Sequence, residues 1–146
     1  YLRAGASMPL VSRIVEVGGK KLLDGGVADP IPLAAFRRMG YGRNIVVLTR
    51  PAGYRKKPAS PLPFQAVYHS YPAFVQAMAD RHAVYNREVA AAECGVADGS
   101  VLLLRPSTEL NISRTERSVQ KLRQLYELGR SDTLARLGEL KHFCQK

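Results

Sequence analysis

The stretch that decides the fold is residues 20–32, which read KKLLDGGVADPIP. Its first four residues have the pattern of a strand end, and the two glycines after Asp24 predict a tight turn, because glycine adopts positive φ without a Cβ clash. The glycines also leave open space beside the carboxylate. An isolated Asp-Gly pair usually bonds only its own backbone. Here a strand delivers the aspartate and prolines lead on to a helix, so Asp24 is the first candidate for chemistry.

A β-hairpin is predicted immediately before this turn, over residues 14–23. Its centre is the pair Gly18-Gly19, which suits a two-residue primed turn. Opposite charges and apolar side chains then meet across the strands. The facing pairs are Glu16 with Lys21, Val15 with Leu22 and Ile14 with Leu23. The hairpin therefore fixes the point at which Asp24 emerges.

The rest of the chain predicts alternating helices and strands. Residues 44–49 (NIVVLT) and 101–104 (VLLL) are apolar runs, typical of strands buried on both faces of a parallel sheet. Residues 32–40 predict a short helix with Leu33, Phe36 and Met39 on one face. A longer helix is predicted from Pro72 to about Gly95, because apolar positions recur at spacings of three and four: Phe74, Met78, His82, Tyr85, Val89 and Ala92. The sequence therefore predicts an α/β fold with a parallel sheet.

Two other segments carry predictions of local structure. The proline-rich stretch Arg50–Pro63 is expected to be a solvated connector, and the alternative is a loop whose Tyr54–Lys57 cluster meets anionic headgroups. Residues 113–116 (SRTE) have the pattern of a capping box at the start of a helix of about fifteen residues. We expect that helix to end at Gly129 and Ser131 to cap a last one.

The motif also resembles a known family. Residues 6–10 (ASMPL), the hairpin and residues 24–32 (DGGVADPIP) together resemble the C-terminal half of the patatin-like phospholipases. Residues 81–86 (RHAVYN) and 125–129 (LYELG) are similar to segments of bacterial members of this family. The resemblance therefore extends over most of the chain. In the family, the aspartate of an Asp-Gly-Gly or Asp-Gly-Ala motif pairs with a serine in a catalytic dyad, and the matching positions here are Asp24, Gly25 and Gly26.

The resemblance implies a three-layer patatin-like α/β fold in which residues 1–146 form the C-terminal portion of one domain. The Gly-x-Ser-x-Gly nucleophile elbow and the glycine-rich oxyanion loop of the family do not occur in these residues. It implies a carboxyl ester hydrolase acting on phospholipid or other lipid esters, with Asp24 as general base and the serine in the N-terminal portion. The fragment alone is expected to be inactive. No cofactor or metal is implied, and lipid degradation is the implied process.

Composition adds a second hypothesis. The formal charge of +10 attracts nucleic acid, anionic lipid surfaces or acidic partners without specifying one. The alternative function is therefore a non-catalytic basic α/β module that binds nucleic acid or an acidic partner, although no nucleic-acid recognition motif is present. The separation of Cys94 from Cys144 favours reduced, cytoplasmic thiols, and no apolar run is long enough to cross a membrane. Peripheral contact with anionic membrane and dimerisation through an exposed sheet edge are further expectations.

The remaining candidate residues favour structural roles. Asp29 precedes a proline near the expected helix start, which favours an N-cap over a paired acid–base role. His82 lies on an apolar helix stripe with no nucleophile motif beside it, so a hydrogen-bonded structural histidine is predicted. Tyr85 and Asn86 are interpreted as helix-anchoring residues. Five glutamates are expected to be solvated charges on helix surfaces: Glu88, Glu93, Glu116, Glu127 and Glu139.

Overall fold

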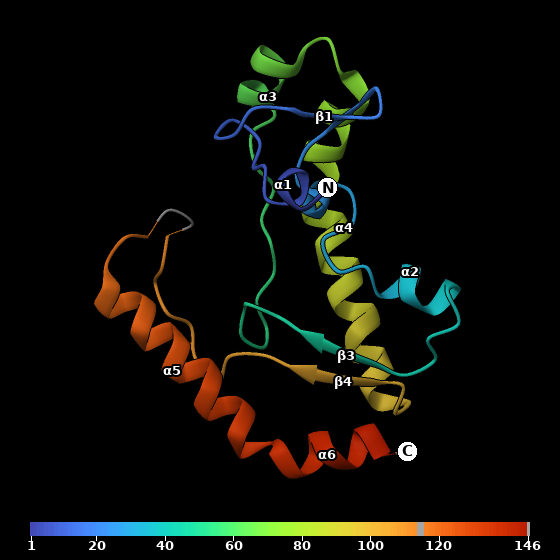
Figure 1. Ribbon diagram of the computed structural model, residues 1–146, viewed down its shortest axis with the longest axis vertical. Helices are drawn as coiled ribbons and strands as arrows, with labels where there is room; N and C mark the ends of the chain where they lie inside the picture. The colour runs from blue at the N-terminus through green and yellow to red at the C-terminus, as the bar shows by residue number, and fades with distance from the viewer. Residues whose placement is uncertain (114–115, 146) are drawn as a thin grey trace. The chain divides into compact units, whose positions relative to one another are not determined.

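The protein is described by a computed structural model that covers residues 1–113 and 116–145 (Figure 1). It is a mixed α/β structure with one antiparallel and one parallel pair of strands, and about half of it is helical. The chain divides into two compact units. The first unit contains Tyr1–Ala35 and Arg55–Ala91, and the second contains Phe36–Tyr54 and Ala92–Lys146.

The hairpin of the first unit forms with the predicted register. Strands β1 (Val15–Val17) and β2 (Lys20–Leu22) pair antiparallel, with Val15 opposite Leu22 and Glu16 opposite Lys21. Gly18 and Gly19 have φ of 56° and 73°. Two successive residues with positive φ define the type I′ turn, whose twist matches that of the strands. The prediction of the hairpin from its glycine pair is confirmed.

Two short helices and a 3₁₀ turn also belong to the first unit. Helix α1 (Leu2–Gly5) opens the chain and the 3₁₀ turn η1 (Gly25–Val27) follows β2. Helix α3 (Leu62–Tyr68) was not predicted from the sequence; it replaces the end of the expected loop, because a proline in the first turn of a helix loses no hydrogen bond.

Helix α4 (Pro72–Ala97) confirms the predicted long helix. The six apolar-stripe residues are all buried or half-buried, from Phe74 to Ala92. The ring of His82 bonds the carbonyl oxygen of Ala79 through Nδ1 at 2.9 Å, which confirms its prediction as a hydrogen-bonded structural residue.

The second unit contains the parallel pair predicted from the two apolar runs. Strand β3 (Asn44–Val47) lies beside β4 (Val101–Leu104), with Asn44 opposite Val101 (Figure 1). All four residues of β4 are buried. The prediction that β3 is buried on both faces is wrong, since the side chains of Ile45 and Val47 are 42% and 70% exposed. In the part of the chain that the structure describes, this sheet has only two strands, and one face of β3 is left uncovered.

Helix α2 (Leu33–Arg38) ends as predicted before a glycine. Gly40 has φ of 95° and its N–H bonds the carbonyl oxygen of Arg37 at 3.0 Å, the arrangement of a glycine that follows a helix C-terminus. The face of α2 that was expected to be apolar and buried is only partly buried. Leu33 is buried, but Phe36 and Met39 are 47% and 70% exposed.

Gly95 has a role that differs from the predicted helix end. Helix α4 continues two residues beyond it to Ala97. A Cβ atom on Gly95 would lie 2.5 Å from Cγ2 of Val101 and 2.8 Å from a guanidinium nitrogen of Arg37. The glycine therefore allows the end of α4 to approach β4 closely.

The C-terminal helices have boundaries that the sequence did not predict. Helix α5 (Val119–Ala135) is capped by Ser118, whose hydroxyl accepts the N–H of Lys121 at 3.4 Å. The expected start at Ser113 is wrong, and the two middle positions of that capping box, 114 and 115, lie outside the described residues. Gly129 lies inside α5. The helix ends at Ala135, and Arg136 separates it from α6 (Leu137–Gln145). The predictions of a helix end at Gly129 and a cap at Ser131 are therefore also wrong.

Candidate functional site

The candidate site is built around Asp24, at the exit of the hairpin. The backbone N–H of Asp24 donates to the carbonyl oxygen of Ser7 at 2.9 Å, and its side-chain Oδ1 accepts the N–H of Gly26 at 2.8 Å. The residue caps the 3₁₀ turn η1 and is half-buried. The bond from Gly26 holds Oδ1 in place and so fixes the orientation of the carboxylate.

The two glycines of the motif act differently from the sequence prediction. Neither Gly25 nor Gly26 has positive φ, so the expected left-handed turn does not form. The chain follows a 3₁₀ turn instead, closed by the N–H of Ala28 on the carbonyl oxygen of Gly25 at 3.1 Å. Gly25 does leave open space, since no atom lies within 4 Å of where its Cβ would be. At Gly26 a Cβ would lie 3.2 Å from Oδ1 of Asp24. Because Gly26 has no Cβ, the carboxylate of Asp24 can fold back onto the turn.

Arg81 on α4 joins the site from a distant part of the sequence. Its Nε donates to the carbonyl oxygen of Gly26 at 2.7 Å. One of its terminal nitrogens lies 3.7 Å from where a Cβ of Gly26 would be. Asp24 contacts the same glycine. The guanidinium thus fixes the turn that orients the carboxylate. Arg81 lies in the segment 81–86 whose sequence resembles the patatin-like family, but the sequence indicated no role for it. Only the folded chain brings Arg81 to Gly26.

The segment upstream of the hairpin is tightly positioned. Ser7 is buried, and its hydroxyl donates to the carbonyl oxygen of Arg3 at 2.8 Å. Leu10 has φ of 67°, a left-handed conformation that is costly for a residue with a branched side chain. The hydroxyl of Tyr68 accepts its N–H at 3.0 Å. This segment carries the carbonyl that holds the backbone of Asp24, so its fixed geometry fixes the site.

Asp29 does not have the predicted N-cap role. Helix α2 begins at Leu33, too far along the chain for Asp29 to cap it. The carboxyl of Asp29 instead interacts with that of Glu88 on α4, whose Oε2 accepts the N–H of Ile31 at 2.8 Å. Burial raises the pKa of Glu88, the bond from Ile31 opposes this, and the nearby charge of Asp29 adds to the rise. Glu88 is therefore a backbone acceptor, and its prediction as a solvated charge is wrong.

Three of the other four predicted surface acids have partners, while Glu127 is exposed on α5 as predicted. Glu93 bonds Arg105 at 3.0 Å and Glu139 bonds Arg136 at 2.7 Å. The carboxylate of Glu116 lies before α5 and accepts the N–H of Ser118 at 3.0 Å. The hydrogen bond from Ser118 lowers the pKa of Glu116, and the bond from Arg136 lowers that of Glu139.

The basic connector is attached to α4 through Asn86. The side chain of Asn86 accepts the backbone N–H of Lys56 at 2.8 Å and donates to its carbonyl oxygen at 3.0 Å. The ammonium of Lys56 also lies 5.0 Å from the ring centroid of Tyr85. These contacts agree with the predicted anchoring role of Tyr85 and Asn86.

A second Asp-Gly pair, Asp98-Gly99, shows which features belong to Asp24 alone. Oδ1 of Asp98 accepts the N–H of Ser100 at 2.9 Å, so both aspartates bond the N–H two residues on. That bond is the ordinary property of an aspartate in a turn. Asp98 is exposed, whereas Asp24 is half-buried, tied through its backbone to Ser7 and flanked by the turn that Arg81 holds.

Three further properties concern ligands and location. Within residues 1–113 and 116–145, no group of three His, Cys, Asp or Glu side chains gathers as a metal site. Cys94 and Cys144 are both free and exposed. No described helix has the length and apolar character needed to cross a membrane.

Comparison with known families finds a match for the C-terminal half of the chain. Residues 71–145 match a family described as a domain of unknown function, DUF6363. The match covers just over half of the chain, so the protein belongs to this family. No curated protein matches the chain.

Proposed function

We propose that the chain is the C-terminal portion of a lipid acyl hydrolase with the three-layer patatin-like fold. In this proposal Asp24 is the general base of a Ser–Asp dyad, and the serine and the oxyanion-binding loop precede Tyr1 in the parent protein. The observation that carries the proposal is the placement of the Asp24 carboxylate, which is half-buried at the exit of the hairpin and oriented by the bond from Gly26 to its Oδ1. The family of the C-terminal half carries no described activity, so the argument rests on this geometry and on the motif.

The chemistry requires only a positioned carboxylate on this side of the dyad. As the serine oxygen attacks the acyl carbonyl, its proton passes to the carboxylate of Asp24. The protonated Asp24 then returns the proton to the departing alcohol, which leaves an acyl-serine ester. Water attacks that ester with Asp24 again as base, releases the fatty acid and restores the serine. In this proposal the serine and the ester approach beside Gly25, where no atom lies within 4 Å of the position of a Cβ.

The proposal includes the setting of this reaction. A Ser–Asp dyad needs no cofactor. The substrate is a phospholipid or other lipid ester, and the positive charge of the chain favours peripheral contact with anionic membrane. Two free, exposed thiols suit a reducing cytoplasm. The two-stranded sheet of β3 and β4 has unpaired edges in the described part of the chain, and such an edge would suit dimerisation with a second copy.

The test compares two aspartates in the parent protein. Asp24→Asn keeps the hydrogen bond to Gly26 but cannot accept the proton, so ester hydrolysis is expected to fall about 100-fold to 10,000-fold. Asp98→Asn is the matched control, because it changes an Asp-Gly aspartate with the same local bond. It is expected to leave hydrolysis unchanged. Full activity of a folded Asp24→Asn protein would refute the role of Asp24 as base.

The alternative of a basic binding module receives less support from the structure. Several cations are already paired with carboxylates: Arg50 with Glu109, Arg105 with Glu93, Lys121 with Glu116 and Arg136 with Glu139. Arg43 lies over the ring of Phe143 at 4.2 Å from its centroid. A parent protein without a Gly-x-Ser-x-Gly motif that bound nucleic acid with steep salt dependence would favour this alternative.

A further inference from the structure

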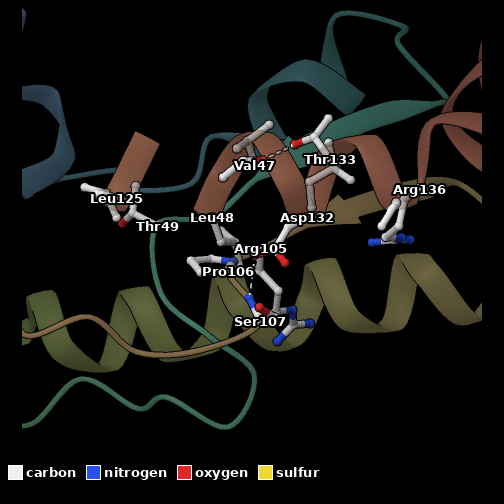
Figure 2. A pocket seen from close by; sticks show the side chains of 13 residues that line it. Val47, Leu48, Thr49, Arg105, Pro106, Ser107, Leu125, Asp132, Thr133 and Arg136 are labelled. Atoms are coloured by element: carbon white, nitrogen blue, oxygen red, sulfur yellow. Dashed lines mark hydrogen bonds between the residues drawn. The ribbon is translucent and has the colours of Figure 1, made fainter. Parts of the chain in front are cut away.

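A cavity of about 430 Å³ lies in the second unit, at the carboxyl ends of the parallel strands. The chain leaving β3 contributes Leu48 and Thr49, the chain leaving β4 contributes Arg105 and Pro106, and α5 closes another side (Figure 2). In open α/β sheets, ligands bind in the crevice outside the carboxyl ends of the strands. The volume falls within the range of small-molecule sites. Position and size therefore indicate a binding site.

The wall of this cavity is largely hydrocarbon. It includes Val47, Leu48, Leu104, Pro106 and Leu125, and no aromatic ring is among the described residues that line it. Val47 is 70% exposed and Leu125 is 39% exposed, although both face the cavity. A ligand that covered them would remove apolar surface from water, which is favourable in proportion to the area buried.

The charged side chains of the wall are already bonded within the protein. Asp132 accepts the backbone N–H of Ser107 at 2.8 Å, and Arg105 bonds Glu93 at 3.0 Å. Arg136 donates to the carboxylate of Glu139 and to the carbonyl oxygen of Leu103. The wall therefore demands no charged ligand, because these groups are satisfied without one.

We infer that this cavity is a binding site for a single alkyl chain, with the polar end of the ligand toward the exposed hydroxyls of Thr49 and Ser107. The chain can belong to a free fatty acid or to an uncharged alcohol or ester, since the wall recognises hydrocarbon. This inference does not depend on the role of Asp24, which lies in the other unit of the chain.

Gly129 offers a way to close the cavity without damaging the fold. It lines the cavity from inside α5, and no atom lies within 4 Å of where its Cβ would be. Gly129→Leu therefore extends a side chain into open space and replaces a poor helix former with a good one. Gly138→Leu is the matched control, because Gly138 is also helical and open but is not among the residues that line the cavity.

The experiment is an NMR titration of the purified chain with octanoate, decanoate, dodecanoate and decanol, each below its micelle concentration. We expect saturable shifts at the cavity residues and an affinity that rises about fourfold for each added methylene. Decanoate and decanol separate the sources: similar affinities mean that the chain alone is recognised, and a preference for decanoate identifies the free acid. Gly129→Leu is expected to weaken decanoate binding at least tenfold and to melt no lower than the parent chain, while Gly138→Leu retains binding.

Three results would overturn the inference. The first is the absence of saturable shifts for every ligand. The second is an equal loss of binding in both glycine variants, which would mean that the effect is not at the cavity. The third is a shift of the cavity residues with protein concentration instead of ligand concentration, which would identify a second copy of the chain as the occupant.

Discussion

The close approach of α4 to β4 predicts that alanine lowers the stability of the protein at Gly95 but raises it at Gly129. Replacing Gly95 with alanine places a methyl group 2.5 Å from Cγ2 of Val101 and 3.1 Å from its Cβ. Favourable carbon contacts lie near 3.5–4.0 Å, so the helix and the strand must separate by about 1 Å. The contact is with a buried residue close to the backbone, and overpacking of this kind costs about 1–3 kcal/mol. The guanidinium of Arg37 can move aside more cheaply.

Helix propensity opposes this cost. Alanine stabilises a helix interior by about 0.5–1 kcal/mol relative to glycine. We therefore expect Gly95→Ala to lower the free energy of unfolding by about 1–2 kcal/mol, and the melting temperature by about 4 °C for each kcal/mol. The assay is denaturant and thermal unfolding followed by circular dichroism.

Gly129→Ala is the control for this reasoning. It makes the same substitution inside α5, where no atom lies within 4 Å of the new Cβ. It is expected to raise stability by about 0.5–1 kcal/mol, since propensity acts there without a clash. Val101→Ala combined with Gly95→Ala should lose less stability than the two single changes added together. Equal effects of alanine at the two glycines, or strict additivity with Val101→Ala, would refute the steric explanation.

Three further predictions concern the first unit. Glu88→Gln keeps an acceptor for the N–H of Ile31 but cannot ionise. Because the pKa of Glu88 is raised in the folded protein, native stability should fall as pH rises above the ordinary glutamate pKa, and the variant should not show this fall. Identical pH–stability curves for the variant and the parent chain would contradict this prediction. Leu10→Asn should stabilise by about 0.5–1 kcal/mol in thermal melts, because asparagine tolerates the left-handed conformation, and a lower melting temperature would count against strain at this exposed position. Asn86→Ala removes both bonds to the Lys56 backbone and should cost about 1–3 kcal/mol, with faster hydrogen exchange at the Lys56 amide; unchanged exchange would exclude the anchoring role.

Local signals predicted the elements of this fold well. The glycine pair determined the hairpin register, because turn type and cross-strand pairing agree there. The apolar runs predicted β3 and β4, and their parallel pairing followed from the helices between them. These features depend on neighbours in sequence, which is why sequence analysis reaches them.

Features set by tertiary contact could not be predicted in this way. The burial of β3 depends on which segments cover it, and the apolar run alone does not record them. Gly95 looked like a helix end, but its reason is the approach of Val101 from another element. The start of α5 was misplaced because the capping-box pattern begins at Ser113, whereas the helix is capped by Ser118.

The candidate site also combines a residue that the sequence predicted with residues that only tertiary contacts bring to it. Asp24 was found from its motif, and its half-buried position follows from the hairpin that carries it. Arg81, Ser7 and Glu88 contact the turn or the segment after it only through folding. The pairing of Glu88 with Asp29 had no sequence signal, because a helical glutamate is usually solvated.

The most direct test of Asp24 as a general base is the rate at which a serine-reactive fluorophosphonate labels the parent protein. We predict single-site labelling of the parent protein and of Asp98→Asn at the same rate, and labelling of Asp24→Asn that is about 100-fold slower or more. Labelling of Asp24→Asn at the rate of the parent protein, with the fold intact, would contradict the account.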